Sequence, residues 1–494
     1  MQLRFANDNW FPSDEFDVML GGKALARGFD LYSEFLSQHM PISYYVSYVF
    51  ELLGAHTVVA QRICYYALFS LCWVLIYVRG KAYLDHRILL IYPIIFMCIL
   101  PTHEYGTVIL SEHLVGIGFV ALLLEYYIFC INRKISLLSC LIIMISVLLT
   151  FGTTFVSIFG LAVIGLAVMG KELMWKRENN QSMKVFFVES IKKYGKLLAV
   201  VSVPWIILVV VYAKKHILKT FIFSAYTLNR QIYPKYLGYG SSIIASLLKS
   251  VDYIGSTISK CFDITSININ SIVILIFTVF IIKAVIFIYR TKGWYQGVVI
   301  TLLLLSLGTR EYYHFHGTQF LAVAAAIIAY YMIEYYVKEK KCFKEGAERY
   351  QTVVPILALV YIAPFISGFS TIGNVDTSKT PNLTAMLLEE FTESDEPIWH
   401  IALNNEVFMI ADRTPVLAAG AVPWMWEGLH ESVMEDIQAN PPRALIYSEG
   451  LNVWGYCIDD YAPELVEYIN NTYTRYNPDA ILYLRNDYYN EVVK

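Results

Sequence analysis

The stretch LLAVVSVPWIILVVVYA, residues 197–213, contains no charged side chain. A helix that crosses a bilayer needs about 20 apolar residues, or about 17 at the short end, so this stretch predicts a membrane span. The composition of the 494-residue chain agrees. Hydrophobic residues make up 57% and charged residues 16%, with a mean hydropathy of +0.50, whereas a soluble domain carries about 25% charged residues. We therefore exclude a cytosolic enzyme. No basic tract suggests a nucleic-acid partner.

Other apolar blocks extend this pattern and predict a polytopic α-helical membrane protein with about ten transmembrane helices. The expected spans are 57–78, 87–101, 107–130, 136–150, 153–170, 197–213, 271–290, 295–308, 319–336 and 352–369. Lys and Arg collect in alternate connections, at residues 79–87, 133–134, 171–196, 290–292 and 338–349. Because cytoplasmic loops carry the excess of Lys and Arg, the other set of connections is expected to face outside.

The C-terminal residues, 371–494, are predicted to form a small extracytoplasmic α/β domain. Strand-like runs alternate there with helix-like runs. The strand-like runs are Pro397–Ala402, Arg443–Tyr447 and Ala480–Leu484, and the helix-like runs are Leu383–Phe391 and Ala462–Asn470. Residues 1–370 are then the transmembrane domain, and residues 1–56 are its first outward loop.

Three stretches on the outward side combine carboxylates with histidines. The first holds Asp14, Glu15, Asp17 and His39, the second His103, Glu104, Glu112 and His113, and the third Arg310, Glu311, His314 and His316. Ionisable residues at membrane depth are costly, so they indicate a functional site. Gathered at one place, they offer carboxylates for proton transfer and an Arg/His group suited to phosphate.

Each residue also has a plainer interpretation. Asp14 taken singly reads as a solvated surface acid. His314 and His316 are interleaved with Tyr312, Tyr313 and Phe315, a pattern typical of an interfacial aromatic belt, and Arg310 could extend its head group to water. Glu112 and His113 are harder to dismiss, since they lie at the start of an apolar run. The combination is more specific than any member.

The chain resembles the GT-C superfamily of membrane glycosyltransferases, near the branch of protein O-mannosyltransferases and aminoarabinose transferases (glycosyltransferase family 39). The N-terminal stretch carries most of the resemblance. Its matching residues are Asp14-Glu15, Gly22 and Gly28, Leu31-Tyr32, Gln38-His39-Met40-Pro41, Tyr44-Tyr45 and Arg62. Met40 stands where the family has a proline. Glu112 matches a second acidic position of the family, residues 310–316 resemble its phosphate-binding loop, and residues 223–240 are similar to bacterial members.

The resemblance implies an inverting transfer of a sugar from a polyprenyl-phosphate donor to a glycan, lipid or protein acceptor. It places the reaction at the outer face of the membrane, and we expect this to be a bacterial plasma membrane. Asp14 and Glu15 are the implied catalytic residues, with the base at Asp14. The implied substrate-binding residues are His39, Glu112, His113, Arg310, His314 and His316. The resemblance implies no definite cofactor, and the participation of a divalent metal is left open.

One departure and two alternatives accompany this interpretation. The family has a span before its acidic loop, whereas Asp14 follows Met1 almost at once, so we expect N-terminal truncation or an N-terminus that itself crosses the membrane. A transporter would also place charges at membrane depth, but no internal repeat is visible in the sequence and the polar stretches lie at one face. A polysaccharide polymerase or ligase handles lipid-linked glycans as well.

Overall fold

The computed structural model describes residues 13–100, 111–180, 182–236, 269–308, 315–339, 382–416 and 422–493, with a few single residues between 251 and 259. The chain divides into two compact units. The helical unit comprises Met1–Asp8, Tyr65–Leu208 and Ser242–Gly373, and the mixed unit comprises Asn9–Cys64, Val209–Ser241 and Asn374–Lys494. The division falls inside two helices, α4 (Val58–Gly80) and α9 (Met183–Lys214). The domain boundary expected at residue 370 stays a prediction.

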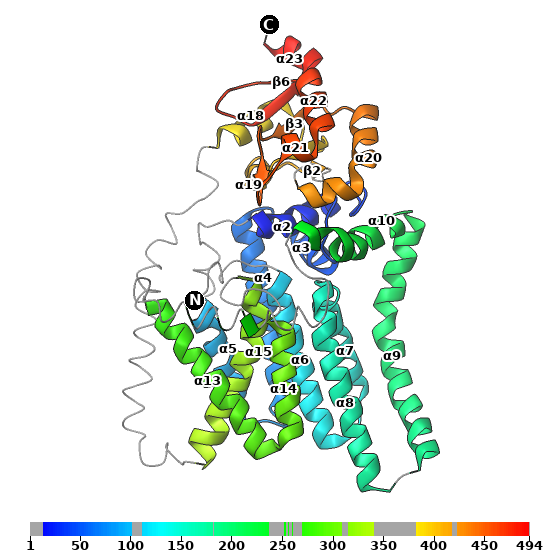
Figure 1. The fold of residues 1–494 in the computed structure, drawn as a ribbon, viewed down its shortest axis with the longest axis vertical. Coiled ribbons are helices and arrows are strands. Elements are labelled where there is room, and N and C mark those ends of the chain that lie inside the picture. Colours follow the sequence, from blue (N-terminus) through cyan, green and yellow to red (C-terminus); the bar gives the residue numbers. More distant parts are fainter. Residues whose placement is uncertain are drawn as a thin grey trace. The chain divides into compact units, whose positions relative to one another are not determined.

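The helical unit consists of long apolar helices that run side by side (Figure 1). Besides most of α4 and α9, its described elements are α5 (His86–Ile99), α6 (Ser111–Asn132), α7 (Leu137–Thr150), η2 (Phe155–Ser157), α8 (Ile158–Glu178), α13 (Ile269–Lys292), α14 (Trp294–Leu307), η4 (Phe315–Gly317), α15 (Thr318–Tyr331) and η5 (Met332–Glu339). Asp85 and Ser136 begin α5 and α7 by accepting hydrogen bonds from backbone N–H groups, which satisfies donors that a helix start leaves open.

Six helices of the described residues are long and apolar enough to cross a membrane. They are Val58–Gly80, Ser111–Asn132, Phe155–Glu178, Val185–Lys214, Val273–Lys292 and Thr318–Tyr335. Three shorter apolar helices, α5, α7 and α14, coincide with further predicted spans. The span expected at 352–369 lies outside the described residues. The protein is therefore mostly helical and built for a bilayer, as the sequence predicted.

Helix α9 begins earlier than the hydropathy indicated. The sequence placed residues 184–196 in a lysine-rich connection, but the helix starts at Met183 and continues to Lys214. Lysine is a good helix former and its charge is tolerated on a solvated helix face, so the helix extends beyond its apolar residues. Lys193 ion-pairs with Glu172 of α8, which holds this polar end of α9 beside its neighbour.

The mixed unit contains short helices and a small sheet. Its helices are α2 (Ser13–Ala26), α3 (Ile42–Leu52), α10 (Leu218–Ile222), the π-helical η3 (Phe223–Ile232), α11 (Tyr233–Tyr236), α18 (Leu383–Phe391), α19 (Glu406–Ile410), α20 (Pro423–Ala439), α21 (Ile458–Tyr461), α22 (Pro463–Thr472) and α23 (Asn486–Val492). The outward segment 1–56 was predicted as a loop, yet two helices form within it. Gly28 and Gly54, both with positive φ, follow α2 and α3, the backbone conformation that glycine adopts most readily.

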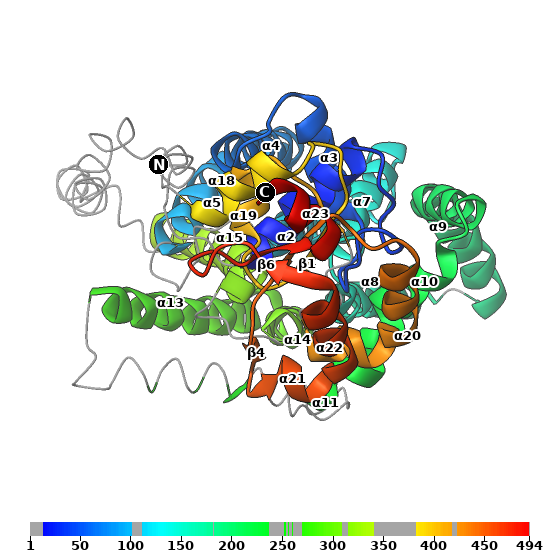
Figure 2. The ribbon, with the colours of Figure 1, turned by 90° about the horizontal axis from the view of Figure 1, so that it is seen from above.

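Five strands form one sheet in the order β2-β1-β3-β7-β6. The strands are β1 (Ile398–Ile401), β2 (Pro415–Val416), β3 (Ala444–Tyr447), β6 (Tyr473–Arg475) and β7 (Leu482–Arg485). β1 pairs in parallel with β2 and β3, and β7 pairs antiparallel with β3 and β6. Helices α18 and α22 lie on opposite sides of this sheet (Figures 1 and 2). The three predicted strands and the two predicted helices of this region are all present.

One hydrophobic core joins three distant parts of the chain within the mixed unit. Leu36 from the N-terminal segment and Leu228 from η3 are buried together with the sheet residues Trp399, Leu445 and Tyr483. Because these parts share buried apolar surface, the residues that follow 374 do not form their core alone. The acidic N-terminal stretch is therefore held by the same packing that holds the sheet.

Candidate active site

The acidic pair Asp14-Glu15 lies in the first turn of α2. Glu15 is completely buried, and Arg62 at the start of α4 is 1% exposed. Arg62 Nε donates to Glu15 Oε1 over 2.7 Å and Nη2 donates to Oε2 over 2.6 Å. This two-point contact uses both carboxylate oxygens and matches the planar geometry of guanidinium and carboxylate.

A second carboxylate of α2 starts a chain of hydroxyl groups. The Tyr44 hydroxyl donates to Asp17 Oδ2 and is also hydrogen-bonded to Ser37. Burial, and then the negative charge of Asp17, raise the pKa of Tyr44, so its phenol stays protonated. His39 lies at the edge of this group, with Nε2 4.0 Å from Asp17 Oδ2 and its side chain about one-third exposed at 33%. His39 is thus accessible, and Asp17 is not a free base.

The backbone at the same place is under constraint. Tyr32 is fully buried and has a positive φ of 69°, a conformation that costs energy for a bulky residue. Its hydroxyl donates to the His39 carbonyl over 2.8 Å, and Asn229 of η3 donates to the Gln38 carbonyl over 2.6 Å. These contacts fix the loop between α2 and α3 and thereby the position of His39.

The other end of α2 is tied to the residues before β2. Lys23, which is 1% exposed, donates to Asp412 Oδ1 over 2.7 Å. Arg27 donates to the same oxygen over 2.9 Å and to Thr414 Oγ1 over 2.9 Å. Partial burial opposes the charge of Asp412, but the hydrogen bond and charge of Lys23, with help from Arg27, leave its pKa lowered. This contact could not be predicted from the sequence, because nothing local links position 23 to position 412.

In the helical unit, the second and third polar stretches come together. Glu112, in the first turn of α6 and 5% exposed, accepts from Ser111 Oγ over 3.0 Å, and its Oε1 lies 2.9 Å from His316 Nδ1 in η4. A close approach of α6 and α15 makes this contact reachable. A Cβ at Gly116 would lie 2.8 Å from the Cβ of Ala322, so only glycine allows these helices to pack so tightly.

Of the remaining predicted site residues, some lie within the described part of the chain and others do not. His113 is 3% exposed and stacks on Phe69 with ring centroids 5.6 Å apart, while Phe96 meets it edge-on. His113 thus packs between aromatic rings of the bundle, and its predicted role in substrate binding stays a prediction. Arg310 and His314, like His103 and Glu104, lie outside the described residues. Asp14 is placed in α2 by its backbone.

The sequence analysis missed a polar contact at the opposite end of α6. Arg79 near the end of α4 donates to both oxygens of Glu125, over 2.6 and 3.0 Å, and to Ser139 over 2.9 Å. Arg79 was counted only as a loop charge. A glutamate near the end of an otherwise apolar helix was the signal that could have revealed it.

The mixed unit also presents an aromatic surface outside the acidic stretch. Trp454, in the turn between β4 (Asn452–Val453) and β5 (Tyr456–Cys457), is 55% exposed and stacks on buried Trp424 at 4.6 Å. Its φ of 54° is again a strained value. Tyr456, 40% exposed, lies against Tyr236, whose hydroxyl donates to Glu427 over 2.8 Å. An exposed ring held by buried partners is preorganised for stacking.

Among the residues that the structure describes, no group of three or more His, Cys, Asp or Glu side chains could hold a metal ion. The arrangement offers an acidic position on α2, a carboxylate–imidazole pair on α6 and η4, and an accessible histidine. No family model, no curated protein and no solved structure matches this chain.

Proposed function

We propose that this protein is an inverting glycosyltransferase that moves a sugar from a polyprenyl-phosphate donor to an acceptor at the outer face of the membrane. The observation that carries the proposal is the start of α2, where Glu15 is locked by Arg62 and Asp14 precedes it. A water-insoluble donor requires an enzyme in the bilayer, and the six candidate membrane spans meet that requirement.

Within this proposal the two acids have different tasks. Glu15 is fully buried and both of its oxygens are engaged by Arg62, so it anchors α2 and takes no proton. Asp14 is the base that accepts the proton of the acceptor hydroxyl as the sugar–phosphate bond breaks. The new bond forms on the opposite face of the sugar carbon, and the lipid phosphate leaves with its electron pair.

Glu112 is the competing base, because an adjacent imidazole can accept or relay a proton. Both Glu112 and Asp14 lie in the first turn of a helix, where the helix dipole stabilises a charged carboxylate, so the dipole does not separate them. Their partners do. Glu112 is 5% exposed and bonded to Ser111 and His316, which suits orientation of a substrate group. We assign His316, with Arg310, His314 and His39, to the phosphate leaving group.

A transporter is the second candidate, favoured by two buried carboxylates on one membrane helix. Glu112 and Glu125 are 5% and 4% exposed, but they are thirteen residues apart on α6, or about 20 Å along its axis. Transporter sites gather near the middle of the bilayer, whereas between these two acids only His113, next to Glu112, is polar and Leu114–Leu124 are all apolar. The polar groups of this helix therefore favour chemistry at a membrane surface over passage across it.

The test uses the whole chain in membrane vesicles or nanodiscs. A radiolabelled sugar linked to undecaprenyl phosphate is supplied with a lipid or glycan acceptor, and transfer is measured as labelled product. We expect transfer that the protein-free membrane lacks, with release of undecaprenyl phosphate. Flux of a solute across sealed proteoliposomes without any transfer would instead establish the transporter.

A further inference from the structure

A cavity of about 330 Å³ lies among the helices of the helical unit, away from the polar stretches considered so far. Its wall is mostly apolar, from residues such as Leu89, Leu123 and Ile300. The volume falls in the range of about 300–1,000 Å³ typical of small-molecule sites. The cavity is open to its surroundings on one side, and an apolar wall favours contact with hydrocarbon over water. An occupant with an apolar body is therefore expected.

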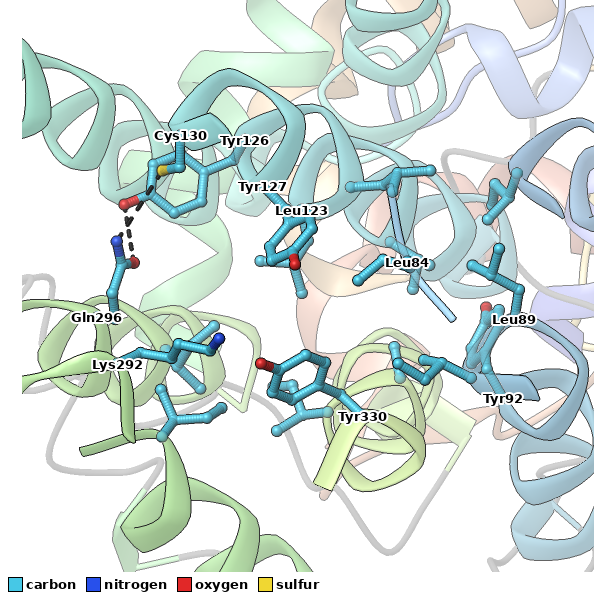
Figure 3. Close-up of a pocket in the computed structure, with 18 of the residues that line it drawn as sticks. Leu84, Leu89, Tyr92, Leu123, Tyr126, Tyr127, Cys130, Lys292, Gln296 and Tyr330 are labelled. Carbon is cyan, nitrogen blue, oxygen red and sulfur yellow. Dashed lines mark hydrogen bonds between the residues drawn. The ribbon is translucent and has the colours of Figure 1, made fainter. Parts of the chain in front are cut away.

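Apart from Tyr92 of α5, the polar groups of this cavity lie toward one end of the bundle. Lys292 is the last residue of α13, Tyr330 is near the end of α15, and Lys171 is in the second half of α8. Tyr126 and Tyr127 lie in the last turns of α6. In Figure 3, Lys292, Tyr127 and Tyr330 direct their polar ends into the cavity, while the aliphatic residues Leu84, Leu89 and Leu123 line the remainder.

The charge at this end has one sign. Two lysines and no acidic residue line the cavity among the described residues. Lys292 Nζ lies 5.8 Å from the ring centre of Tyr330, and Lys171 Nζ lies 5.4 Å from that of Tyr295. No carboxylate is paired with either lysine in the described parts of the chain. Two ammonium groups at the mouth of an apolar cavity fit an anion that carries a hydrocarbon chain.

The position agrees with the distribution of basic residues. The cavity lies at the helix ends that join residues 79–87, 133–134 and 290–292, the connections rich in Lys and Arg. By the positive-inside rule these connections meet the cytoplasmic leaflet, which holds anionic lipids.

We propose that this cavity binds one anionic diacyl phospholipid of that leaflet, with an acyl chain between α5, α6 and α15 and the phosphate at Lys171 and Lys292. Gln296 accepts from the Tyr126 hydroxyl over 3.0 Å and lines the same polar end, where it can meet the glycerol region. The site is separate from sugar transfer, and it does not depend on the function proposed above.

The experiment is native mass spectrometry of the full chain, delipidated in detergent and then supplied with equal amounts of phosphatidylglycerol and phosphatidylcholine. Each lysine near a head group favours the anionic lipid roughly fivefold, so the intact protein should retain one phosphatidylglycerol with a preference of about 25-fold. The preference should disappear in the double variant K171A/K292A and persist in K171R/K292R. Lys134→Ala, an exposed lysine outside the cavity, is the matched control and should leave the preference unchanged.

A second variant tests the apolar part. Ala326 lines the cavity, and Ala326→Phe should fill it and reduce retention of both lipids. Equal retention of the two lipids by the intact protein would overturn the proposal, as would an unchanged preference in K171A/K292A. Displacement of phosphatidylglycerol by an equimolar amount of undecaprenyl phosphate would also overturn it and assign the cavity to a prenyl lipid. If K171A/K292A does not fold, the preference of the intact protein for phosphatidylglycerol over phosphatidylcholine decides whether the proposal holds.

Discussion

Helix α4 carries two arginines, and each makes a two-point contact with a glutamate, but the two ion pairs differ in their access to water. Arg62 and Glu15 are 1% and 0% exposed at their side chains, whereas Arg79 and Glu125 are 16% and 3% exposed. Arg62 holds a short helix of the mixed unit, while Arg79 holds α6 and, through Ser139, α7.

This difference has a physical consequence. A charge left alone in a dry interior costs far more than one that water can reach, because the interior cannot replace its hydration. The Arg62 pair is thus indispensable to the placement of α2, and the Arg79 pair is one stabilising contact among several. The proposed base, Asp14, directly precedes the more buried pair.

The largest effect on stability is expected for Glu15→Gln. It replaces the carboxylate that meets the buried Arg62 guanidinium by a neutral amide, so the free energy of unfolding should fall by about 3–5 kcal/mol. Denaturant titration in mixed micelles measures this value. Glu431→Gln, an exposed position on α20, serves as the control and should change it by less than about 0.5 kcal/mol. In the double variant Glu15→Gln/Arg62→Met, part of the stability should return, since both charges of the buried pair are removed together. If the loss in the double variant equals the sum of the losses in the two single variants, the two side chains are not coupled and the expectation is wrong.

A smaller loss is expected for Arg79→Gln. Charge-assisted hydrogen bonds contribute about 1.5–3 kcal/mol, and the Arg79 side chain is 16% exposed, so its replacement leaves water a path to the Glu125 carboxylate. The same titration should therefore show a decrease in that range, below the effect of Glu15→Gln. Lys81→Gln, exposed in the neighbouring connection, is the control. Equal losses at Arg79 and Glu15 would contradict the distinction between the two ends of α4.

The smallest effect concerns Asp412, whose side chain is 60% exposed. Its folded-state pKa is lowered by Lys23 and Arg27 against the effect of partial burial. A lowered pKa contributes stability above the unfolded value of about 3.9 and loses it as the pH falls through the folded value. At pH 6 the free energy of unfolding of the wild-type protein should therefore exceed that of Asp412→Asn by about 1 kcal/mol or less. This difference should vanish near pH 2–3. A difference that grows on acidification would show the opposite sign of pKa shift.

The spans and the strands could be predicted from the sequence because both depend on local pattern. Apolar length marks α4 or α13 directly, and the runs around Ile398, Ala444 and Leu482 have the composition of buried strands. The ion pairs could not be predicted in the same way. Glu15 meets Arg62, and Lys23 meets Asp412, only because one core joins residues near 36, 228 and 445. Such pairings depend on tertiary packing, which a single sequence does not display.

The candidate site shows the same limit. Glu112 was selected because it interrupts an apolar run, and the structure places it against His316. Glu125 interrupts the same helix near its other end and was passed over, because its partner Arg79 was counted as a loop charge. His113 looked equally functional by sequence, yet its ring is enclosed by Phe69 and Phe96. Burial partners, which a pattern does not reveal, separate these three residues.

The exposed Trp454 allows a test of the acceptor side. If its ring stacks on a sugar of the acceptor, Trp454→Ala should raise the acceptor KM by about twofold to tenfold with little change in kcat, since one aromatic contact is worth about 0.5–1.5 kcal/mol. Trp294→Ala, exposed in the helical unit, is the control. A loss of kcat at unchanged KM would argue against a binding role for Trp454.

The central claim is that Asp14 acts as the base while Glu15 is held by Arg62. The most direct measurement is turnover with an undecaprenyl-phosphate-linked sugar for Asp14→Asn beside Glu112→Gln, at matched expression and matched thermal stability. A positioned base contributes about a hundred- to ten-thousand-fold, so Asp14→Asn should lose turnover by that factor without losing stability. Glu112→Gln should retain more activity and show a weaker affinity for substrate. Near-normal turnover of Asp14→Asn together with an inactive Glu112→Gln would move the base to α6 and contradict the account.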